Sequence, residues 1–223
     1  MFSILLVLKI LFWIAIILIG WFIFVETVGR VIRRFIHFPI PSFLVPLLDN
    51  PIRRRIQPPA KVIDWIDIKD GMQVLEIGPG VGTFTIEASR RVGEKGRVYA
   101  IDIQSNVVLK LKRRLRREGI TNAEAIVGSA YELPLRDKSI DRAFMIAVLG
   151  EIPDKRKALL EIKRVLKDGG LLAIGELLID PDYPRKKTTI GWCREAGFEL
   201  IGSYGNILHY LLTFKKSMSG STI

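Results

Sequence analysis

The sequence predicts an α/β fold: a doubly wound, mostly parallel seven-stranded sheet with an antiparallel C-terminal strand, preceded by one transmembrane helix. Three observations predict it. Strand-like and helix-like segments alternate after Pro59, the first of these strands runs into a glycine-rich loop, and a long uncharged apolar run lies near the N-terminus. Strands that alternate with helices are typical of a parallel sheet covered on both faces.

The N-terminal apolar run predicts a transmembrane helix over residues 1–27. From Ile10 to Val25 the chain has sixteen residues without a charged or hydroxyl side chain. As a helix they span roughly 24 Å, and residues 2–25 together about 36 Å, against about 30 Å for the hydrocarbon core of a bilayer. A cleaved signal peptide would have a shorter apolar core and a small-residue cleavage site, and a buried core helix is rarely apolar on every side.

The distribution of positive charge predicts the orientation of this helix. Arg30, Arg33, Arg34 and the triplet at 53–55 follow the run, whereas only Lys9 and the N-terminus precede it. Segments rich in Lys and Arg favour the cytoplasmic side of a membrane. We therefore expect a single-pass membrane protein whose larger, C-terminal part, including any catalytic domain, is cytoplasmic.

Residues 28–59 form a basic and apolar segment, which we predict to lie at the membrane interface. Prolines at positions 39, 41, 46 and 51 exclude one continuous helix. Large apolar side chains interleaved with arginines suit an anionic membrane surface, with the guanidinium groups on lipid phosphates. The alternative is a linker packed on the surface of the following domain.

The composition gives no support for a metal site or an internal disulfide. The chain of 223 residues carries a net charge of +11 and contains one cysteine, Cys193, and two histidines, His37 and His209. A zinc cluster normally needs more such ligands, so we expect no metal. Cys193 lies in a helix-like stretch, "IGWCREAGF", and is expected to be buried.

A domain is predicted over residues 60–216, followed by a disordered tail at 217–223. Its strands are expected at 73–78, 97–102, 123–128, 141–149 and 171–179, and its helices at 83–92, 105–118 and 154–170. The last helix is expected to stop at its glycine pair. Residues 198–216 are expected to form two strands joined near Gly205 and Asn206, which gives the sheet an antiparallel finish.

The glycine loop "VLEIGPGVGTFT" follows the first of these strands and predicts a nucleotide site. Its pattern is E-x-G-x-G-x-G, and Thr83 stands where a dinucleotide-binding G-x-G-x-x-G loop needs its last glycine. A P-loop is excluded because no Lys-Ser/Thr pair follows. Asp102 ends the second strand, twenty residues past Gly82, where a carboxylate accepts hydrogen bonds from ribose hydroxyls. An adenosine compound is therefore expected.

Four motifs together resemble a known family. "VLEIGPGVGTFT", "VYAIDI", "GSAYELPLRDKSIDRAFMIAVLGEIPD" and "RVLKDGGLLAIGE" follow the order and spacing of the class I S-adenosylmethionine-dependent methyltransferases. They look most like the branch with the ubiquinone/menaquinone biosynthesis enzymes and the small bacterial phospholipid N-methyltransferases. The resemblance covers about Lys61 to Lys216. It implies a Rossmann-like methyltransferase fold and S-adenosyl-L-methionine as the cofactor.

The resemblance also implies roles for individual residues. The methionine end of the cofactor is expected beside Glu76, acting partly through water, and beside the backbone of Gly78, Pro79, Gly80 and Gly82. Asp102 is expected to bind the ribose, and Ile103 to pack on the adenine. The adenine amine is expected near Ser129 and Ala130, and the carbonyl of Ala147 is expected to receive the cofactor's amino group.

The chain departs from the family pattern at two positions. Ser129 stands where the family usually has Asp, and a neutral acceptor is weaker than a charged one, so some loss of cofactor affinity is expected. Gly150 stands where related enzymes often have a histidine. Glu151 is then the candidate base, a counter-charge for a cationic amine, or a surface residue. Tyr183 is either a cover for the substrate entrance or a packed loop tyrosine.

A run of positive residues on the expected helix 105–118 points to no nucleic-acid partner. Lys110, Arg113, Arg114 and Arg117 share one face, but no aromatic platform or reading helix accompanies them. A solvated face is the simplest interpretation, and attraction to anionic lipid the next.

These features together predict a membrane-anchored methyltransferase acting on a lipid or lipid-soluble acceptor, either a phospholipid amine headgroup or an isoprenoid quinone ring. The alternative, favoured by Ser129 and Gly150, is a non-catalytic membrane-tethered scaffold or regulator that binds S-adenosylmethionine. Methylation of proteins at the membrane has no feature here that selects it.

Overall fold

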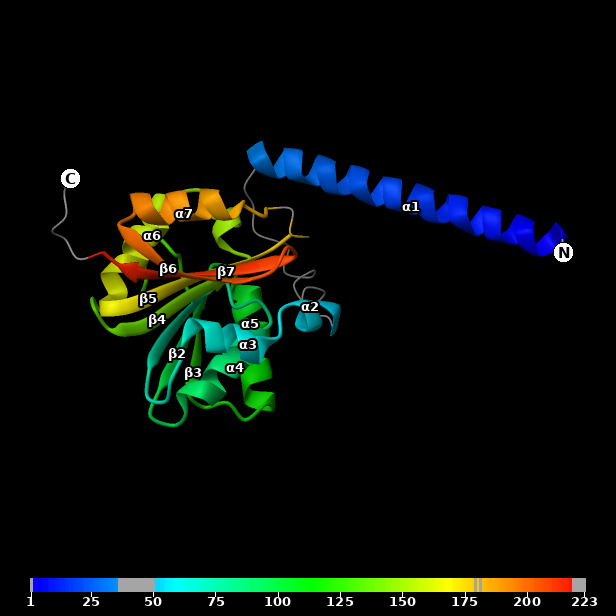
Figure 1. The fold of residues 1–223 in the computed structure, drawn as a ribbon. Coiled ribbons are helices and arrows are strands. Elements are labelled where there is room, and N and C mark those ends of the chain that lie inside the picture. Colours follow the sequence, from blue (N-terminus) through cyan, green and yellow to red (C-terminus); the bar gives the residue numbers. More distant parts are fainter. Residues whose placement is uncertain (1, 36–50, 179, 181, 218–223) are drawn as a thin grey trace. The chain divides into compact units, whose positions relative to one another are not determined.

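The computed structural model describes residues 2–35, 51–178, 180 and 182–217 (Figure 1). The chain divides into two compact units, residues 1–38 and residues 39–223. The predicted tail at 217–223 lies outside the described residues except for Ser217, and so does the proline-rich stretch over 36–50.

The first unit consists of helix α1 (Phe2–Phe35). It continues past residue 27, where the sequence predicted its end, and takes in Arg30, Arg33 and Arg34. Its described large apolar side chains are exposed, among them Trp13, Ile17 and Trp21. Among the residues whose side chains are described, no helix offers an apolar stretch long enough for a membrane span. The predicted transmembrane helix is therefore not confirmed.

The second unit contains the predicted sheet. Its strands are β1 (Gln73–Ile77), β2 (Arg97–Asp102), β3 (Ala123–Val127), β4 (Ile140–Ile146), β5 (Leu166–Leu177), β6 (Phe198–Gly205) and β7 (His209–Lys216). They form one seven-stranded sheet in the order β3-β2-β1-β4-β5-β7-β6. Strands β1 to β5 pair in parallel, and β7 is antiparallel to both of its neighbours. The doubly wound sheet with an antiparallel finish is confirmed.

Helices cover both faces of this sheet (Figure 1). On one face lie α3 (Pro59–Ile66), α4 (Thr83–Val92) and α5 (Ser105–Arg117), and on the other α6 (Lys155–Val165) and α7 (Lys186–Glu195). A short helix α2 (Pro51–Ile56) precedes α3. The predicted segments begin where α4 and α5 begin. In contrast, α3 was not predicted, although it buries Val62, Ile63 and Ile66 against the sheet.

The end of α6 and the beginning of β5 differ most from the predicted bounds within the sheet domain, for a common reason. Helix α6 ends at Val165 and does not reach the glycines at 169 and 170, because the N–H groups of Lys138 and Ser139 donate to the carbonyls of its last turn. Leu166 is fully buried and pairs with Ile140 as the first residue of β5. Tertiary hydrogen bonds thus stop the helix earlier than the local glycine signal.

The parallel arrangement brings the carboxyl ends of β1 to β5 to one edge of the sheet. The predicted site residues Glu76, Asp102, Ser129 and Ala147 all lie at or just after these ends. In doubly wound sheets this edge is where ligands bind. Cys193, expected to be buried, is buried on α7, where desolvation raises the pKa of its thiol to about 12.

Candidate functional site

The loop from Gly78 to Gly82 connects β1 to α4 and needs glycine for its backbone. Gly78, Gly80 and Gly82 have φ values of 69°, 55° and 88°, in the left-handed region that other residues rarely adopt. A Cβ at Gly78 would lie 2.4 Å from Val148 Cγ2, and one at Gly82 would lie 2.3 Å from Leu111 Cδ1. The bare backbone of the loop therefore packs close to the segment that follows β4 and to α5.

Hydrogen bonds fix the shape of this loop. The N–H of Gly78 donates to the carbonyl of Ile101 at 2.9 Å, and the N–H of Gly82 donates to that of Pro79 at 2.9 Å. Gly82 is also the residue before α4, with its carbonyl accepting from Ile86. The loop thus presents the N-terminal end of α4 at the ligand edge, with no side chain in front of it at these glycines.

Glu76 lies beside the loop and is 2% exposed. Its Oε2 accepts a hydrogen bond from the hydroxyl of Thr85 at 2.5 Å. Burial raises the pKa of Glu76 to about 8, with the nearby Asp102 adding to the rise and the Thr85 hydrogen bond opposing it. A carboxyl group in this state readily receives a cationic amino group, because that group compensates its buried negative charge.

Asp102 and Ile103 lie at the end of β2. Burial raises the pKa of Asp102, while the N–H of Gln104, which donates to its Oδ1 at 2.8 Å, lowers it. Ile103 is 64% exposed, so an apolar face is open directly after the carboxylate. This pair suits a ribose with its attached base, the carboxylate for the hydroxyls and the isoleucine for the flat ring.

Ser129 and Ala130 lie in the segment between β3 and β4. The hydroxyl of Ser129 accepts a hydrogen bond from the N–H of Tyr131 at 3.1 Å, and its backbone pairs with Glu132. The N–H of Gly128 donates to the carbonyl of Asp102 at 3.0 Å. These hydrogen bonds hold the Ser129 segment next to Asp102, as expected for two sides of one adenosine site.

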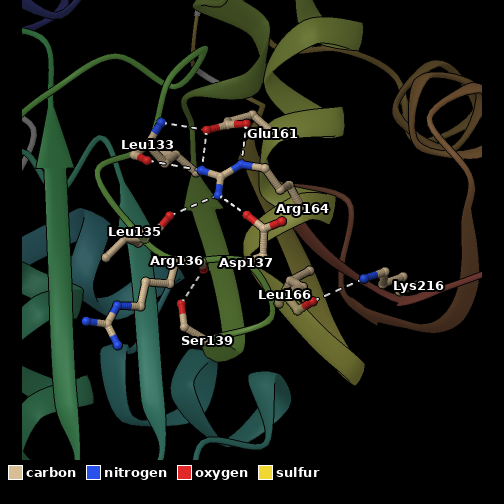
Figure 2. A network of polar contacts seen from close by, with 9 residues as sticks. All are labelled: Leu133, Leu135, Arg136, Asp137, Ser139, Glu161, Arg164, Leu166 and Lys216. Carbon is tan, nitrogen blue, oxygen red and sulfur yellow. Dashed lines mark hydrogen bonds and ion pairs between the residues drawn. The ribbon is translucent and has the colours of Figure 1, made fainter.

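Arg164 on α6 anchors the rest of this segment (Figure 2). Its guanidinium group donates to both carboxylate oxygens of Glu161, to Asp137, and to the carbonyls of Leu133 and Leu135. The hydrogen bonds from Arg164 lower the pKa of Glu161, which in turn accepts from the N–H of Leu133. Arg164 is the first residue of the motif "RVLKDGGLLAIGE", but its role was not predicted, since an arginine on a basic helix carries no distinctive signal.

Ala147 directly follows β4 and has a left-handed backbone. Its φ is 58°, unusual for a residue with a side chain, and its N–H donates to the carbonyl of Gly175 at 2.8 Å. Backbone strain of this kind concentrates at functional sites. The left-handed conformation of Ala147 turns the chain away from the sheet. The next residue, Val148, contacts the glycine loop.

Gly150 lies in the 3₁₀ turn η2 (Leu149–Glu151), where related enzymes often have a histidine. A Cβ at Gly150 would lie 2.4 Å from the carbonyl oxygen of Asp182. The segment after β5 therefore packs directly on this turn, and there is no room for a larger residue. Glu151 follows it, half-buried.

Tyr183 is half-buried after β5, with its ring 5.5 Å from that of Tyr210 in an edge-on contact. Burial raises the pKa of its phenol. Beside it the structure adds a group that the sequence analysis missed: Glu176, a buried carboxylate near the end of β5. A lone glutamate inside the apolar run "LLAIGELLI" was the available signal.

The residues of this edge fit S-adenosylmethionine. Packing against Val148 and Leu111 leaves no room for a side chain at Gly78 and Gly82, so the loop offers bare backbone at these two positions. The two carboxyl groups, Glu76 and Asp102, match a cationic amino group and a sugar. The exposed Ile103 matches the base. Within the described ranges, no group of three or more His, Cys, Asp or Glu side chains is placed to hold a metal ion.

Comparison with known proteins agrees with this fit. Residues 68–209 match the family described as "Methyltransferase domain". The chain is 37% identical over 123 residues to the ubiquinone/menaquinone biosynthesis C-methyltransferase UbiE of Klebsiella pneumoniae (strain 342), covering 53% of this chain and 49% of that protein. It is 33% identical over 143 residues to an uncharacterized 37.1 kDa protein in transposon TN4556 of Streptomyces fradiae, covering 63% of this chain and 41% of that protein.

A solved structure extends the similarity over most of the chain. The crystal structure of a SAM-dependent methyltransferase from Aquifex aeolicus has a TM-score of 0.75 and 27% identity, and the match covers 79% of this chain and 98% of that one. The two curated relatives are longer than the matched region, and this chain spans only about half of their length or less.

Proposed function

Because the chain belongs to the class I S-adenosylmethionine-dependent methyltransferases, we propose that it is a membrane-anchored enzyme that methylates a lipid or lipid-soluble acceptor. S-adenosylmethionine is its methyl donor. When bound, it supplies a methyl group attached to a positively charged sulfur, which is a good leaving group. Glu76 and the backbone of residues 78–82 would hold the amino-acid end of the donor. Asp102, Ile103 and Ser129 would hold the adenosine.

The apolar run near the N-terminus is the main support for a lipid acceptor. Ile10 to Val25 contain no charged residue, and in α1 the large apolar side chains that the structure describes are exposed to between 38% and 66%. Exposed apolar side chains in such number are expected to be covered by lipid or protein. A bilayer is the simplest cover for an apolar run that is followed by arginines, and it would place the enzyme beside substrates that never leave the membrane.

A second apolar surface on the domain supports the same proposal. The turn between β6 and β7 exposes Ile207 to 84%, with Leu208 and Tyr204 beside it partly exposed. Tyr204 stacks on Trp65 with ring centroids 5.6 Å apart, and Lys61 lies over the same Trp65 ring at 5.3 Å. Aromatic and apolar side chains beside a lysine suit a membrane interface.

The acceptor site is proposed near Glu151 and Tyr183. Since Gly150 replaces the family's histidine, Glu151 is the candidate to take a proton or to face a cationic acceptor, and Tyr183 the candidate to cover the entrance. Holding an acceptor in line with the methyl group supplies most of the acceleration. The basic residues of α5 and of positions 28–59 are proposed to attract anionic lipid from the cytoplasmic side.

Methyl transfer into extracted lipid tests this function. The full chain would be incubated with methyl-labelled S-adenosylmethionine and vesicles of mixed phospholipid and quinone, and the label followed into the organic phase. We expect label in a lipid, and much less of it with Asp102→Ala at a limiting concentration of the methyl donor. Label found only in water-soluble acceptors would contradict a lipid acceptor, while leaving the methyltransferase assignment in place.

A further inference from the structure

A buried carboxylate with an unpartnered oxygen lies next to the proposed acceptor site. Glu176 is the second-last residue of β5 and is 1% exposed. Its Oε1 has no hydrogen-bond partner within the part of the chain that is described. Buried polar atoms are nearly always hydrogen-bonded, so this oxygen marks a position where a donor is missing.

The neighbouring hydroxyl does not supply that donor. Tyr210 is directly opposite Glu176 on β7. Its hydroxyl donates to the carbonyl of Pro184 at 2.8 Å and lies 2.8 Å from the hydroxyl of Thr189. The hydroxyl of Tyr210 is therefore already hydrogen-bonded to α7 and to the segment before it.

Three further carboxylates face Glu176, and together we call Glu151, Glu176, Asp180 and Asp182 the acidic cluster. Burial raises the pKa of Glu176 well above its usual value, and Asp180, Glu151 and Asp182 raise it further, in that order. Asp180 and Asp182 are ordered by local hydrogen bonds, since Asp180 Oδ1 accepts from the N–H of Asp182 at 3.1 Å. Negative charge is thus concentrated around the unpartnered oxygen.

Among the described residues, the positive charges of Arg53 and Lys155 interact with carboxylates of the acidic cluster. Arg53 on α2 lowers the pKa of Glu176, an effect smaller than those of burial and of the other carboxylates. Burial lowers the pKa of Lys155, although Asp182 and Glu176 raise it. The ammonium of Lys155 donates to the carbonyl of Ile152 at 2.7 Å and lies 4.9 Å over the Trp192 ring.

The acidic cluster adjoins the cofactor edge through the backbone. The N–H of Ala147 donates to the carbonyl of Gly175, the residue before Glu176. Gly150 packs against the carbonyl oxygen of Asp182, and Tyr183, next in the chain, contacts Tyr210. The cluster therefore lies where the acceptor is proposed to enter.

We propose that the acidic cluster binds the ammonium group of an amine-bearing methyl acceptor, with Oε1 of Glu176 accepting one of its hydrogen bonds. An ammonium group is a compact cation with three donors, so it can donate one hydrogen bond to the unpartnered oxygen while the nearby carboxylates attract its charge. A bound metal ion is not the better occupant, since none of the described side chains form a group suited to one. This inference rests on the proposed function and deepens it, because it selects an amine headgroup over a quinone ring.

Binding of short-chain lipids tests the inference without methyl transfer. The full chain in detergent, saturated with S-adenosylhomocysteine, would be titrated by calorimetry with dihexanoyl phosphatidylethanolamine, dihexanoyl phosphatidylglycerol and free ethanolamine. Glu176→Gln removes the charge of the buried carboxylate, and Glu199→Gln, at an exposed position on β6, is the matched control. Asp182→Asn is a second variant that leaves the core intact.

We expect the amine lipid to bind at least tenfold more tightly than phosphatidylglycerol, and Glu176→Gln and Asp182→Asn to remove most of that preference. Affinity for S-adenosylhomocysteine stays unchanged in both, which also reports on their folding, and Glu199→Gln behaves like the wild type. Equal binding of the two lipids by the wild type, or an unchanged preference in Asp182→Asn and in a folded Glu176→Gln, would overturn the inference.

The outcomes separate this inference from the proposed function. Tight binding of the amine lipid with no methyl transfer to any lipid would refute the proposed function and support ammonium binding by the acidic cluster. Methyl transfer to a quinone, without a preference for binding the amine lipid, would support the proposed function and overturn ammonium binding by the acidic cluster. Ethanolamine that binds as tightly as the amine lipid would support the cluster and identify a water-soluble amine as its ligand.

Discussion

Carboxyl groups with raised pKa values define the ligand edge at the scale of single residues. Glu76, Asp102 and Glu176 lie near the ends of three parallel strands, and burial is the largest cause of the rise in each. Each is therefore less stable as an anion in the folded protein than in water. A cationic or hydrogen-bonding ligand offsets that cost, which explains why such residues belong to a binding site.

The pKa of Glu76 predicts a pH dependence of stability. Because this pKa is about 8 in the folded protein against a reference value of 4.5, the folded chain holds the proton more tightly than the unfolded chain. The contribution of Glu76 to the free energy of unfolding is therefore most favourable below pH 4.5. It falls as the pH rises towards 8, by at most about 1.4 kcal/mol for each pH unit. Glu76→Gln should flatten this part of the profile.

Thermal unfolding of the cofactor-free protein between pH 5 and pH 8 measures the effect. The wild type should lose more of its melting temperature over this range than Glu76→Gln, and Glu94→Gln, exposed on the surface, should follow the wild type. Parallel profiles for the wild type and Glu76→Gln would show that Glu76 does not titrate in this window.

Gly78 predicts a second effect at the residue scale. Gly78→Ala combines a left-handed backbone with a Cβ only 2.4 Å from Val148 Cγ2, so it should destabilise the fold by roughly 2 kcal/mol or more and impair cofactor binding. Gly119→Ala has nearly the same φ, 67°, but nothing within 4 Å of its Cβ. It should cost about 1–2 kcal/mol from backbone strain alone.

Urea unfolding and calorimetric binding of S-adenosylmethionine distinguish the two variants. Gly119→Ala should retain wild-type affinity, whereas Gly78→Ala should lose at least about tenfold. Equal affinities in both variants would contradict the close approach of the glycine loop to Val148.

At the scale of elements, one guanidinium group connects α6 to the segment between β3 and β4. The segment carries Ser129 and Ala130, and Arg164 donates to its carbonyls at Leu133 and Leu135 (Figure 2). We expect Arg164→Met to lower the free energy of unfolding by about 1–3 kcal/mol and to weaken adenosine binding, because the carbonyls and Glu161 lose their donor.

Lys138→Met provides the matched comparison for this prediction. Lys138 pairs with Asp168 at 2.7 Å, but both side chains are more than half exposed, so the loss should be clearly smaller than that of Arg164→Met. Urea unfolding of both variants measures the difference. Equal losses would mean that the Arg164 network contributes no more than a surface ion pair.

The sequence predicted the elements of the sheet well where the local pattern and the packing agree. Helices α4 and α5 begin at Thr83 and Ser105 as expected, and β2 has the predicted bounds. The prediction failed where distant groups decide: the N–H groups of Lys138 and Ser139 end α6, and the core buries α3. Local patterns carry no information about such contacts.

The same division holds for the candidate site. The predicted cofactor residues lie at one edge because their motifs end consecutive parallel strands, and their roles in binding stay predictions. Glu176 and Arg164 were missed because their importance depends on burial and on partners far along the chain. Gly150 was noticed as a departure, but only the structure shows the carbonyl of Asp182 against it.

At the scale of the whole molecule, the two units are expected to have separate tasks. All the hydrophobic core clusters that the structure describes begin at Val62 or later, so the catalytic domain should fold without the first unit. A chain that lacks residues 1–38 should bind S-adenosylmethionine like the full chain. It should sediment with anionic vesicles far less, and less still as salt is raised.

Vesicle sedimentation and calorimetry of the two chains test this separation. Equal sedimentation at high salt would contradict the role of the N-terminal run as an anchor. Loss of cofactor affinity in the shorter chain would contradict the independence of the domain.

The most direct test of the whole account is the affinity of Asp102→Ala for S-adenosylmethionine, measured by titration calorimetry beside the wild type and Glu94→Ala. The account predicts that the wild type and Glu94→Ala bind equally and that Asp102→Ala binds at least about tenfold more weakly, since two charge-assisted hydrogen bonds to the ribose are lost. Undiminished affinity in Asp102→Ala, or no binding by the wild type, would contradict it.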